Sequence, residues 1–176
     1  MNINELIVKR ESCRGYKPTA VSLDQLKAMV DVARMAPSAA NTQFWRFYVS
    51  NSPEVVKKIA AGCMPMERNP FAASAPAFIV MTRELEAEPW VPQTPYNHYY
   101  RDFDCGSAAT HICFAATELG LSTCMIGWFD DALIKEACGY PDDEKASIVF
   151  TVGYAESDTL RDKTRKSLGD ILTVLE

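Results

Sequence analysis

Residues 36–47 hold the side chains that point most directly to chemistry, reading A-P-S-A-A-N-T-Q-F-W-R-F. They follow an amphipathic run and precede a strand-like run, so they connect a helix to a strand. A plain connection needs fewer polar residues, whereas this one sets four hydrogen-bonding side chains among small residues: Ser38, Asn41, Thr42 and Gln43. A flat ligand can approach such a backbone closely. The segment therefore predicts a loop that binds a cofactor.

Two basic groups could bind an anion. Residues 10–14 read R-E-S-C-R, so Arg10 and Arg14 flank the hydroxyl of Ser12. Arginine forms planar, bidentate, charge-assisted hydrogen bonds with phosphate. Near the other end of the chain, three cations occupy alternate positions: Arg161, Lys163 and Arg165. Alternate residues of an extended segment point the same way, so the three could converge on one anion. Taken alone, each group also fits a solvated turn or tail.

A fourth segment, residues 120–130, reads G-L-S-T-C-M-I-G-W-F-D. Gly127 stands at the expected end of a strand, where a missing side chain lets backbone N–H groups approach a ligand. An ordinary strand-to-helix turn is the alternative reading of this segment.

Composition narrows the class of protein. The chain has 176 residues, which suits a single domain over residues 1–176, and a net charge of −5, which argues against nucleic-acid binding. Its longest purely apolar run, residues 75–81, is too short to span a bilayer, and the N-terminus has no signal-peptide pattern. Six scattered cysteines without a C-x-x-C pair, and two histidines at no metal-ligand spacing, predict free thiols in a reducing cytoplasm and no metal site.

The elements that must position these segments alternate between helix and strand, which indicates an α/β or α+β class. Helices are expected over residues 4–9, from a capping box of Ser22 and Gln25 to Pro37, over 53–61, from an Asp104 cap to Gly120, and from Asp130 to 138. Strands are expected over 44–50, 77–82, 123–128 and 146–154, with a long loop over 84–101. The helix ending at Gly120 is apolar around most of its circumference, so it is central or lies at a subunit interface.

Together the four segments resemble, in order and spacing, the nitroreductase family of flavin enzymes. The family pattern R-R-S-x-R reads R-E-S-C-R here, and A-P-S-x-x-N-x-Q-P-W-x-F reads A-P-S-A-A-N-T-Q-F-W-R-F. The pattern A-A-x-x-L-G-L-x-T-C-x-I-G reads A-A-T-E-L-G-L-S-T-C-M-I-G, and a strand ending in G-Y is followed by K-x-R at Lys163 and Arg165. The resemblance covers nearly the whole chain.

The resemblance implies an α+β fold, a three-layer sandwich whose central, mostly antiparallel sheet is flanked by helices. It also implies an intertwined homodimer with one flavin mononucleotide (FMN) in each of two interface sites. The phosphate and ribityl end would be held by Arg10, Ser12, Arg14, Lys163 and Arg165. The other subunit would approach the ring and ribityl chain with Pro37, Ser38, Ala39, Asn41 and Gln43. Backbone near the flavin N5 edge would come from Met125, Ile126 and Gly127.

The implied reaction is a ping-pong transfer in which NADH or NADPH gives a hydride to flavin N5 and leaves. A small-molecule acceptor, such as a nitroaromatic or a quinone, then takes it. The flavin carries the difficult chemistry, so no catalytic acid or base is assigned. The chain has no G-x-G-x-x-G fingerprint of a Rossmann site. Reductive dehalogenation, flavin destruction and dehydrogenation on the same scaffold, or flavin binding without turnover, stay open as alternatives.

Two residues depart from the family pattern. Glu11 puts a negative charge where the family has a basic residue, and Phe44 stands where proline is common. The flavin-contacting segment that larger family members carry between the second and third strands is not recognisable here. Arg68 and Asn69 are candidate flavin contacts, although ordinary surface loop residues are the better reading of them. Aromatic residues of the 84–101 loop would wall the acceptor site or pack the dimer: Trp90, Tyr96, His98, Tyr99 and Tyr100. Cys13 lies beside the proposed phosphate site, and its reactivity is open.

Overall fold

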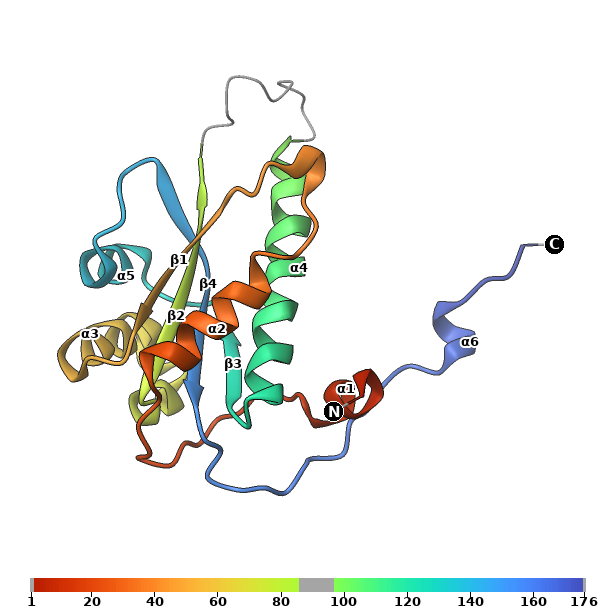
Figure 1. Ribbon diagram of the computed structural model, residues 1–176, viewed down its shortest axis with the longest axis horizontal. Helices are drawn as coiled ribbons and strands as arrows, with labels where there is room; N and C mark the ends of the chain where they lie inside the picture. The colour runs from red at the N-terminus through yellow and green to blue at the C-terminus, as the bar shows by residue number, and fades with distance from the viewer. Residues whose placement is uncertain (1, 86–96, 176) are drawn as a thin grey trace.

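The computed structural model describes residues 2–85 and 97–175 (Figure 1). The helices are α1 (Ile3–Lys9), α2 (Leu23–Ala33), α3 (Pro53–Cys63), α4 (Asn97–Glu118), α5 (Asp131–Cys138) and α6 (Leu168–Ile171). The strands are β1 (Trp45–Ser50), β2 (Ala77–Glu84), β3 (Ser122–Ile126) and β4 (Glu144–Gly153). Short 3₁₀ turns are η1 (Ala39–Asn41), η2 (Pro65–Glu67) and η3 (Pro70–Ser74). Every expected helix and strand is present, and apart from the start of α4 the bounds shift by a few residues.

The four strands form one sheet in the order β1-β2-β4-β3, and every neighbouring pair is antiparallel. In β2, Val80 pairs with Tyr48 of β1 on one side and with Val149 of β4 on the other. A register shift between Met81 and Thr82 marks a bulge in β2. The antiparallel sheet confirms the α+β class and excludes the α/β alternative.

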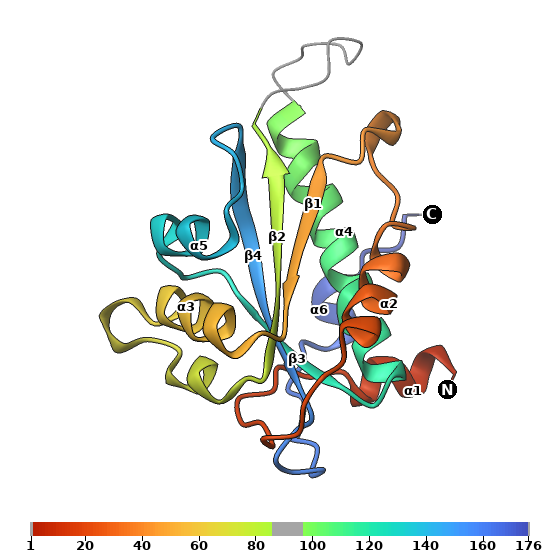
Figure 2. The same cartoon turned by 60° about the vertical axis from the view of Figure 1, so that its left-hand side comes forward.

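Helices cover both faces of the sheet, with α2 and α4 on one face and α3 and α5 on the other (Figures 1 and 2). Strand side chains alternate between the two faces, so each face has its own core. Ile79 and Met81 pack with the α2 and α4 residues, whereas Phe78 and Val80 pack with those of α3 and α5. The predicted three-layer sandwich is confirmed.

Local sequence signals set several helix ends as expected. Gln25 N donates to Ser22 Oγ and Ser22 N donates to Gln25 Oε1, which completes the capping box of α2. Asp130 caps α5 by accepting from the N–H groups of Ala132 and Leu133. Helix α2, however, ends at Ala33, before Pro37, because the next residues turn through shorter 3₁₀-type bonds. The proline follows the helix end rather than making it.

The prediction for the start of α4 is wrong. The helix begins at Asn97, so Asp104 lies inside it and caps no helix, and the expected 84–101 loop loses residues at both ends. Asp104 instead accepts a hydrogen bond from the backbone of Ala39. Residues 97–104 carry buried polar side chains, Arg101 and Asp104, on the side that faces the body. An apolar stripe is therefore missing there, and the sequence shows no helical period.

The chain after β4 runs away from the sandwich, and α6 lies apart from it in Figure 1. Five apolar residues of this tail are more than half exposed: Leu168, Ile171, Leu172, Val174 and Leu175. A capping box between Ser167 and Asp170 starts α6. Among residues 2–85 and 97–175, the structure contains no helix with the length and hydropathy of a membrane span.

Candidate functional site

The R-E-S-C-R segment lies along the edge strand β3. Cys13 N donates to the carbonyl of Thr123 at 2.9 Å, and Ser12 pairs with Thr123 in a parallel bridge. Lys17 N donates to Tyr154 O, which ties the following residues to the end of β4. This backbone pairing brings the predicted anion-binding residues Arg10, Ser12 and Arg14 next to the strand that ends at Met125 and Ile126.

The basic tail meets the same segment from the other end of the chain. Arg161 Nη2 donates to Ser12 O at 2.6 Å, and Arg161 Nε lies 3.5 Å from Glu11 Oε1. Lys163 Nζ donates to Val8 O and lies 3.9 Å from Glu11 Oε2. Two of the three tail cations therefore reach the R-E-S-C-R segment. Arg165 does not reach it, because its Nη1 bonds to the neighbouring Thr164 carbonyl and its side chain is exposed.

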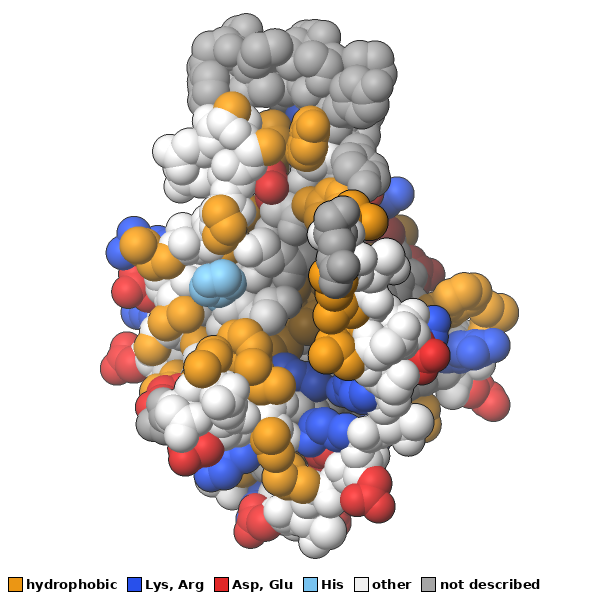
Figure 3. All heavy atoms as spheres, turned by 90° about the vertical axis from the view of Figure 1, so that its right-hand side faces the viewer, with side chains coloured by type: hydrophobic (Ala, Val, Ile, Leu, Met, Phe, Trp, Pro, Cys, Tyr) orange, Lys and Arg blue, Asp and Glu red, His pale blue; other side chains and the backbone are white. Residues whose placement is uncertain are grey.

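A cleft of about 880 Å³ opens beside this group. Its lining comes from Lys9 and residues 11–15, the end of α4 with the start of β3, and residues 155–161. Figure 3 shows Lys and Arg side chains gathered at a hollow on the face of the molecule that carries the tail. The cleft includes Ser12, Arg14 and Arg161. The other predicted site residues of these segments lie outside its lining: Arg10, Lys163, Arg165, Met125, Ile126 and Gly127. Its volume falls in the range of small-molecule sites.

The end of β3 presents a second surface. Met125 is 40% exposed and Gly127 is exposed, whereas Ile126 is buried with the α3 and α5 core. The Arg68 guanidinium lies 5.5 Å from the ring centre of Trp128, and Asn69 Nδ2 donates to Trp128 O and to Cys63 O. The two residues that sequence reasoning left open thus lie beside the 125–128 segment. A polar pair between two prolines in a turn was the only sequence signal for them.

The loop that connects α2 to β1 lies at the other end of α4. Ala39 N donates to both carboxylate oxygens of Asp104 at 3.1 and 3.2 Å, and Gln43 N donates to Ser38 Oγ at 3.1 Å. Three non-glycine residues have positive φ: Ala40 (52°), Asn41 (56°) and Gln43 (51°). Each such residue costs about 1–2 kcal/mol of backbone strain, less for asparagine. Pro37, Asn41 and Gln43 are exposed, and Ser38 and Ala39 are half-buried.

The predicted site is split within one chain. Asp104 contacts the 37–43 loop, whereas Thr117 lines the cleft beside the R-E-S-C-R segment. Thirteen helical residues separate the two, which at 1.5 Å per residue is about 20 Å. Figures 1 and 2 show the loop and α1 at opposite ends of α4. One chain brings together Arg10, Ser12, Arg14, Lys163 and the end of β3, but it does not bring the loop to them.

Burial shifts the pKa of one group near each half of the predicted site, Asp104 at the 37–43 loop and Cys124 in β3. Burial raises the pKa of Asp104, and the hydrogen bond from Ala39 opposes this shift. Burial also raises the pKa of the Cys124 thiol, and the positive charge of Arg14 partly offsets this shift.

In the described part of the chain, no three His, Cys, Asp or Glu side chains gather as metal ligands. Of the predicted acceptor wall, Tyr100 is 47% exposed, while Trp90 and Tyr96 and the side chains of His98 and Tyr99 lie outside the described residues.

Fold and site together define an α+β sandwich protein with a cluster of cations beside the edge strand of its sheet. The chain belongs to the nitroreductase family, because the Nitroreductase family model matches residues 7–67 and 63–154. The match spans both basic N-terminal residues, the loop, and the strand that ends in Gly153 and Tyr154. The family resemblance of the sequence is confirmed.

Individual relatives agree with this assignment. A putative NADH dehydrogenase/NAD(P)H nitroreductase of Archaeoglobus fulgidus is 27% identical over 88% of this chain and 86% of its own length. The crystal structure of a nitroreductase family protein from Clostridium difficile 630 is 28% identical, has a TM-score of 0.81, and matches over 98% of both chains. An FMN-dependent nitroreductase from Clostridium difficile R20291 has the same fold, with 24% identity, a TM-score of 0.74, and coverage of 96% of this chain and 94% of that one.

Proposed function

We propose that the chain is an FMN-dependent oxidoreductase that passes a hydride from NADH or NADPH through the flavin to an oxidised small molecule. Family membership and the relatives named as NAD(P)H and FMN-dependent nitroreductases support this assignment. Nitroaromatics and quinones are the proposed acceptors, because flat electron-poor rings can stack on an exposed flavin. The proposed setting is a reducing cytoplasm, in line with six free cysteines.

The observation that carries the proposal is that two cations of the tail bind the backbone of the N-terminal segment that carries Arg10 and Arg14. Arg161 and Lys163 of the tail hydrogen-bond to Ser12 and Val8, next to Arg10 and Arg14. An FMN phosphate carries close to two negative charges, so it needs such a group on a chain of net charge −5. When FMN is bound, it supplies the hydride chemistry. The residues of this chain bind its phosphate, orient its ring and exclude water.

The site that we propose is shared by two copies of the chain. The 37–43 loop lies about 20 Å from the cation cluster along α4, so it can complete a site only with the cluster of another copy. The exposed apolar tail supports a homodimer, because Leu168, Ile171 and Leu172 are more than half exposed and burial would stabilise each by about 1–2 kcal/mol. In this proposal residues 1–176 form one FMN-binding domain, and the partner's loop faces the flavin.

The flavin test is direct. Purified protein should be yellow, and its flavin absorbance should bleach when NADH or NADPH is added without oxygen. Adding a nitroaromatic or a quinone should restore the absorbance with turnover. A protein that stays colourless after incubation with FMN contradicts the proposal.

The same experiment distinguishes the alternative functions. A protein that binds FMN but is not reduced by either nicotinamide would favour dehalogenation, flavin destruction or dehydrogenation. Slow reduction without any acceptor turnover would favour a flavin-binding protein with a storage or sensing role. A screen of acceptors against the reduced protein then identifies the substrate class.

A further inference from the structure

Two side chains of α4 hold the two ends of the 39–44 segment. The Asp104 carboxylate accepts from the N–H of Ala39, and the Arg101 guanidinium lies 4.2 Å from the ring centre of Phe44. Residues three apart share one face of a helix, so a single face of α4 contacts both ends of the segment. The segment contains η1, leads into β1 and carries the residues proposed to face the flavin.

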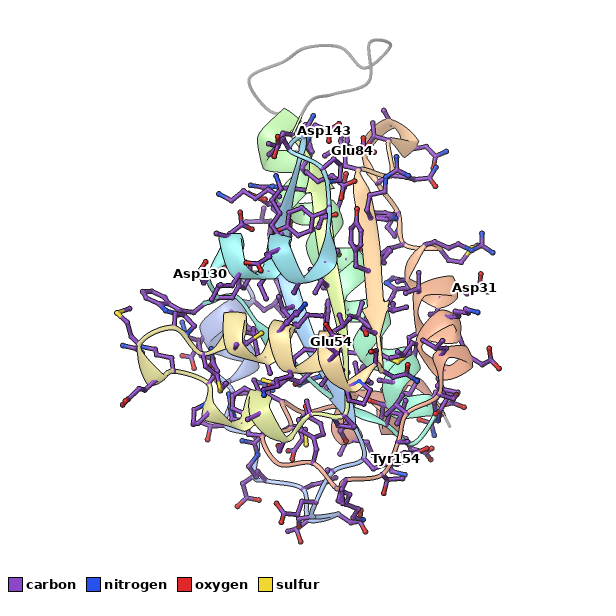
Figure 4. All side chains as sticks on the ribbon, turned by 90° about the vertical axis from the view of Figure 1, so that its left-hand side faces the viewer. Asp31, Glu54, Glu84, Asp130, Asp143 and Tyr154 are labelled. Atoms are coloured by element: carbon purple, nitrogen blue, oxygen red, sulfur yellow. The ribbon has the colours of Figure 1, made fainter. Side chains whose placement is uncertain are left out.

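The contact between Arg101 and Phe44 is buried. Arg101 is 3% exposed and Phe44 is 2% exposed. Arg101 Nη1 donates to Glu84 O at 3.0 Å and to Leu85 O at 2.6 Å, while its buried Nε has no hydrogen-bond partner. Glu84 N in turn donates to Phe44 O at 3.0 Å, so Arg101, Phe44 and Glu84 each contact the other two. Figure 4 labels Glu84 at this end of the sheet, near Asp143.

The segment between the two anchors adopts a backbone that its residues disfavour. Ala40, Asn41 and Gln43 have positive φ, which L-residues other than glycine adopt at a cost. The family pattern commonly has a proline at position 44, and a proline would stiffen such a loop by fixing its own φ. Phe44 has no such constraint, so here the stiffness comes from outside, through the ring held under Arg101.

We propose that Arg101 is a positioning residue that acts through Phe44 to hold the 38–43 loop in its flavin-binding conformation. The inference rests on the proposed function, because it assumes that this loop faces FMN. Arg101 itself touches neither the flavin nor the acceptor in this account. Its effect on flavin affinity is therefore indirect and depends on the Phe44 ring.

The experiment titrates the full-length apoprotein with FMN and follows the quenching of flavin fluorescence. Phe44→Leu and Arg101→Met should each raise the dissociation constant of FMN about tenfold, since either change frees the loop. The double variant should bind no more weakly than the weaker single variant, because both changes remove one interaction. Arg101→Lys should lie between wild type and Arg101→Met, because it keeps a cation over the ring but loses the planar fork.

Two matched variants separate positioning from general destabilisation. Phe78→Leu truncates an equally buried phenylalanine in the α3 and α5 core. Arg83→Met removes an arginine of β2 that pairs with Asp102 near the start of α4. Both should leave the FMN dissociation constant within about twofold of wild type, whatever they do to the melting temperature.

Each outcome decides the inference. Additive losses of affinity in the double variant would overturn it. So would a Phe78→Leu variant that loses as much FMN affinity as Phe44→Leu at equal melting temperature. If Arg101→Met does not fold, Phe44→Leu and Arg101→Lys decide alone, and unchanged affinity in both overturns the inference. A wild-type protein that binds no FMN overturns the proposed function and this inference with it, whereas wild-type binding with unaltered variants overturns the inference only.

Discussion

Glu11 and Arg161 stand 150 positions apart in the chain, and their side chains lie 3.5 Å apart between Oε1 and Nε. Arg161 N also donates to Glu11 Oε2, and Lys163 Nζ lies 3.9 Å from the same oxygen. The carboxylate that departs from the family pattern therefore faces two cations of the proposed phosphate site. It lowers the positive charge there while it ties the tail to the N-terminal segment.

Glu11→Gln should bind FMN more tightly than wild type. The phosphate then no longer competes with a carboxylate, and Arg161 stays in place through its 2.6 Å bond to Ser12 O. Removing one like charge from a solvent-rich anion site is worth about 1 kcal/mol, or about fivefold in affinity. The gain should shrink at high salt, because screening weakens exposed charges. Weaker binding in titrations at low salt would mean that Glu11 mainly positions the tail.

Asn41→Ala should weaken FMN binding without unfolding the protein. Asn41 is exposed and has a φ of 56°, so alanine removes the side chain and adds about 1 kcal/mol of strain. Asn41→Gly removes the same side chain but accepts the positive φ. If the side chain binds FMN, both variants should lose affinity in a titration. Loss in the alanine variant alone would assign the effect to the backbone.

Asp104→Asn should raise the melting temperature at neutral pH, and its advantage should fade in acid. Burial raises the pKa of Asp104 in the folded protein above its unfolded value. The folded state therefore binds the proton more readily, and stability is gained as pH falls through the raised pKa. Asparagine does not titrate, yet its amide oxygen can still accept from Ala39 N. Melting curves from pH 7 to about pH 4 test this, and a constant difference between the two proteins would contradict it.

The thiols of Cys63 and Cys138 should react slowly in the native protein. Burial raises the pKa of Cys63 to about 12 and that of Cys138 to about 11. At pH 8 the thiolate then accounts for about one Cys138 side chain in a thousand and fewer of Cys63. A disulfide reagent should label Cys138, which is half-buried, before Cys63, and should label all six thiols in denaturant. Rapid labelling of Cys63 without denaturant would contradict the burial seen here.

Sequence reasoning succeeded where the cause is local and failed where it is not. The capping box of Ser22 and Gln25 and the cap at Asp130 act on neighbouring residues, so their pattern is legible in the chain. Arg101 and Asp104 contact residues 39, 44, 84 and 85, which no local pattern connects to them. Because these two buried side chains are polar, the sequence pattern did not indicate the first two turns of α4.

For the candidate site, too, sequence reasoning predicted some features and missed others. Motif spacing predicted the residues around Arg10 and Lys163, and backbone pairing with β3 brings most of them together. The positive φ of Ala40 and Gln43 has no sequence signal, and the charge of Glu11 alone does not reveal which distant residues it pairs with. Both depend on contacts between distant segments, which form only in the folded chain.

Mixing two inactive variants tests the shared flavin site most directly. Arg14→Glu with Lys163→Glu removes the cation half, and Asn41→Trp blocks the loop half, so neither protein alone should bind FMN. Unfolded and refolded together at equal concentrations, random pairing makes about half the dimers mixed, each with one intact site. FMN binding should then return to about a quarter of the wild-type level, because one site of two is intact in half the dimers. No recovery from two variants that still form mixed dimers would show that a single chain holds the whole site.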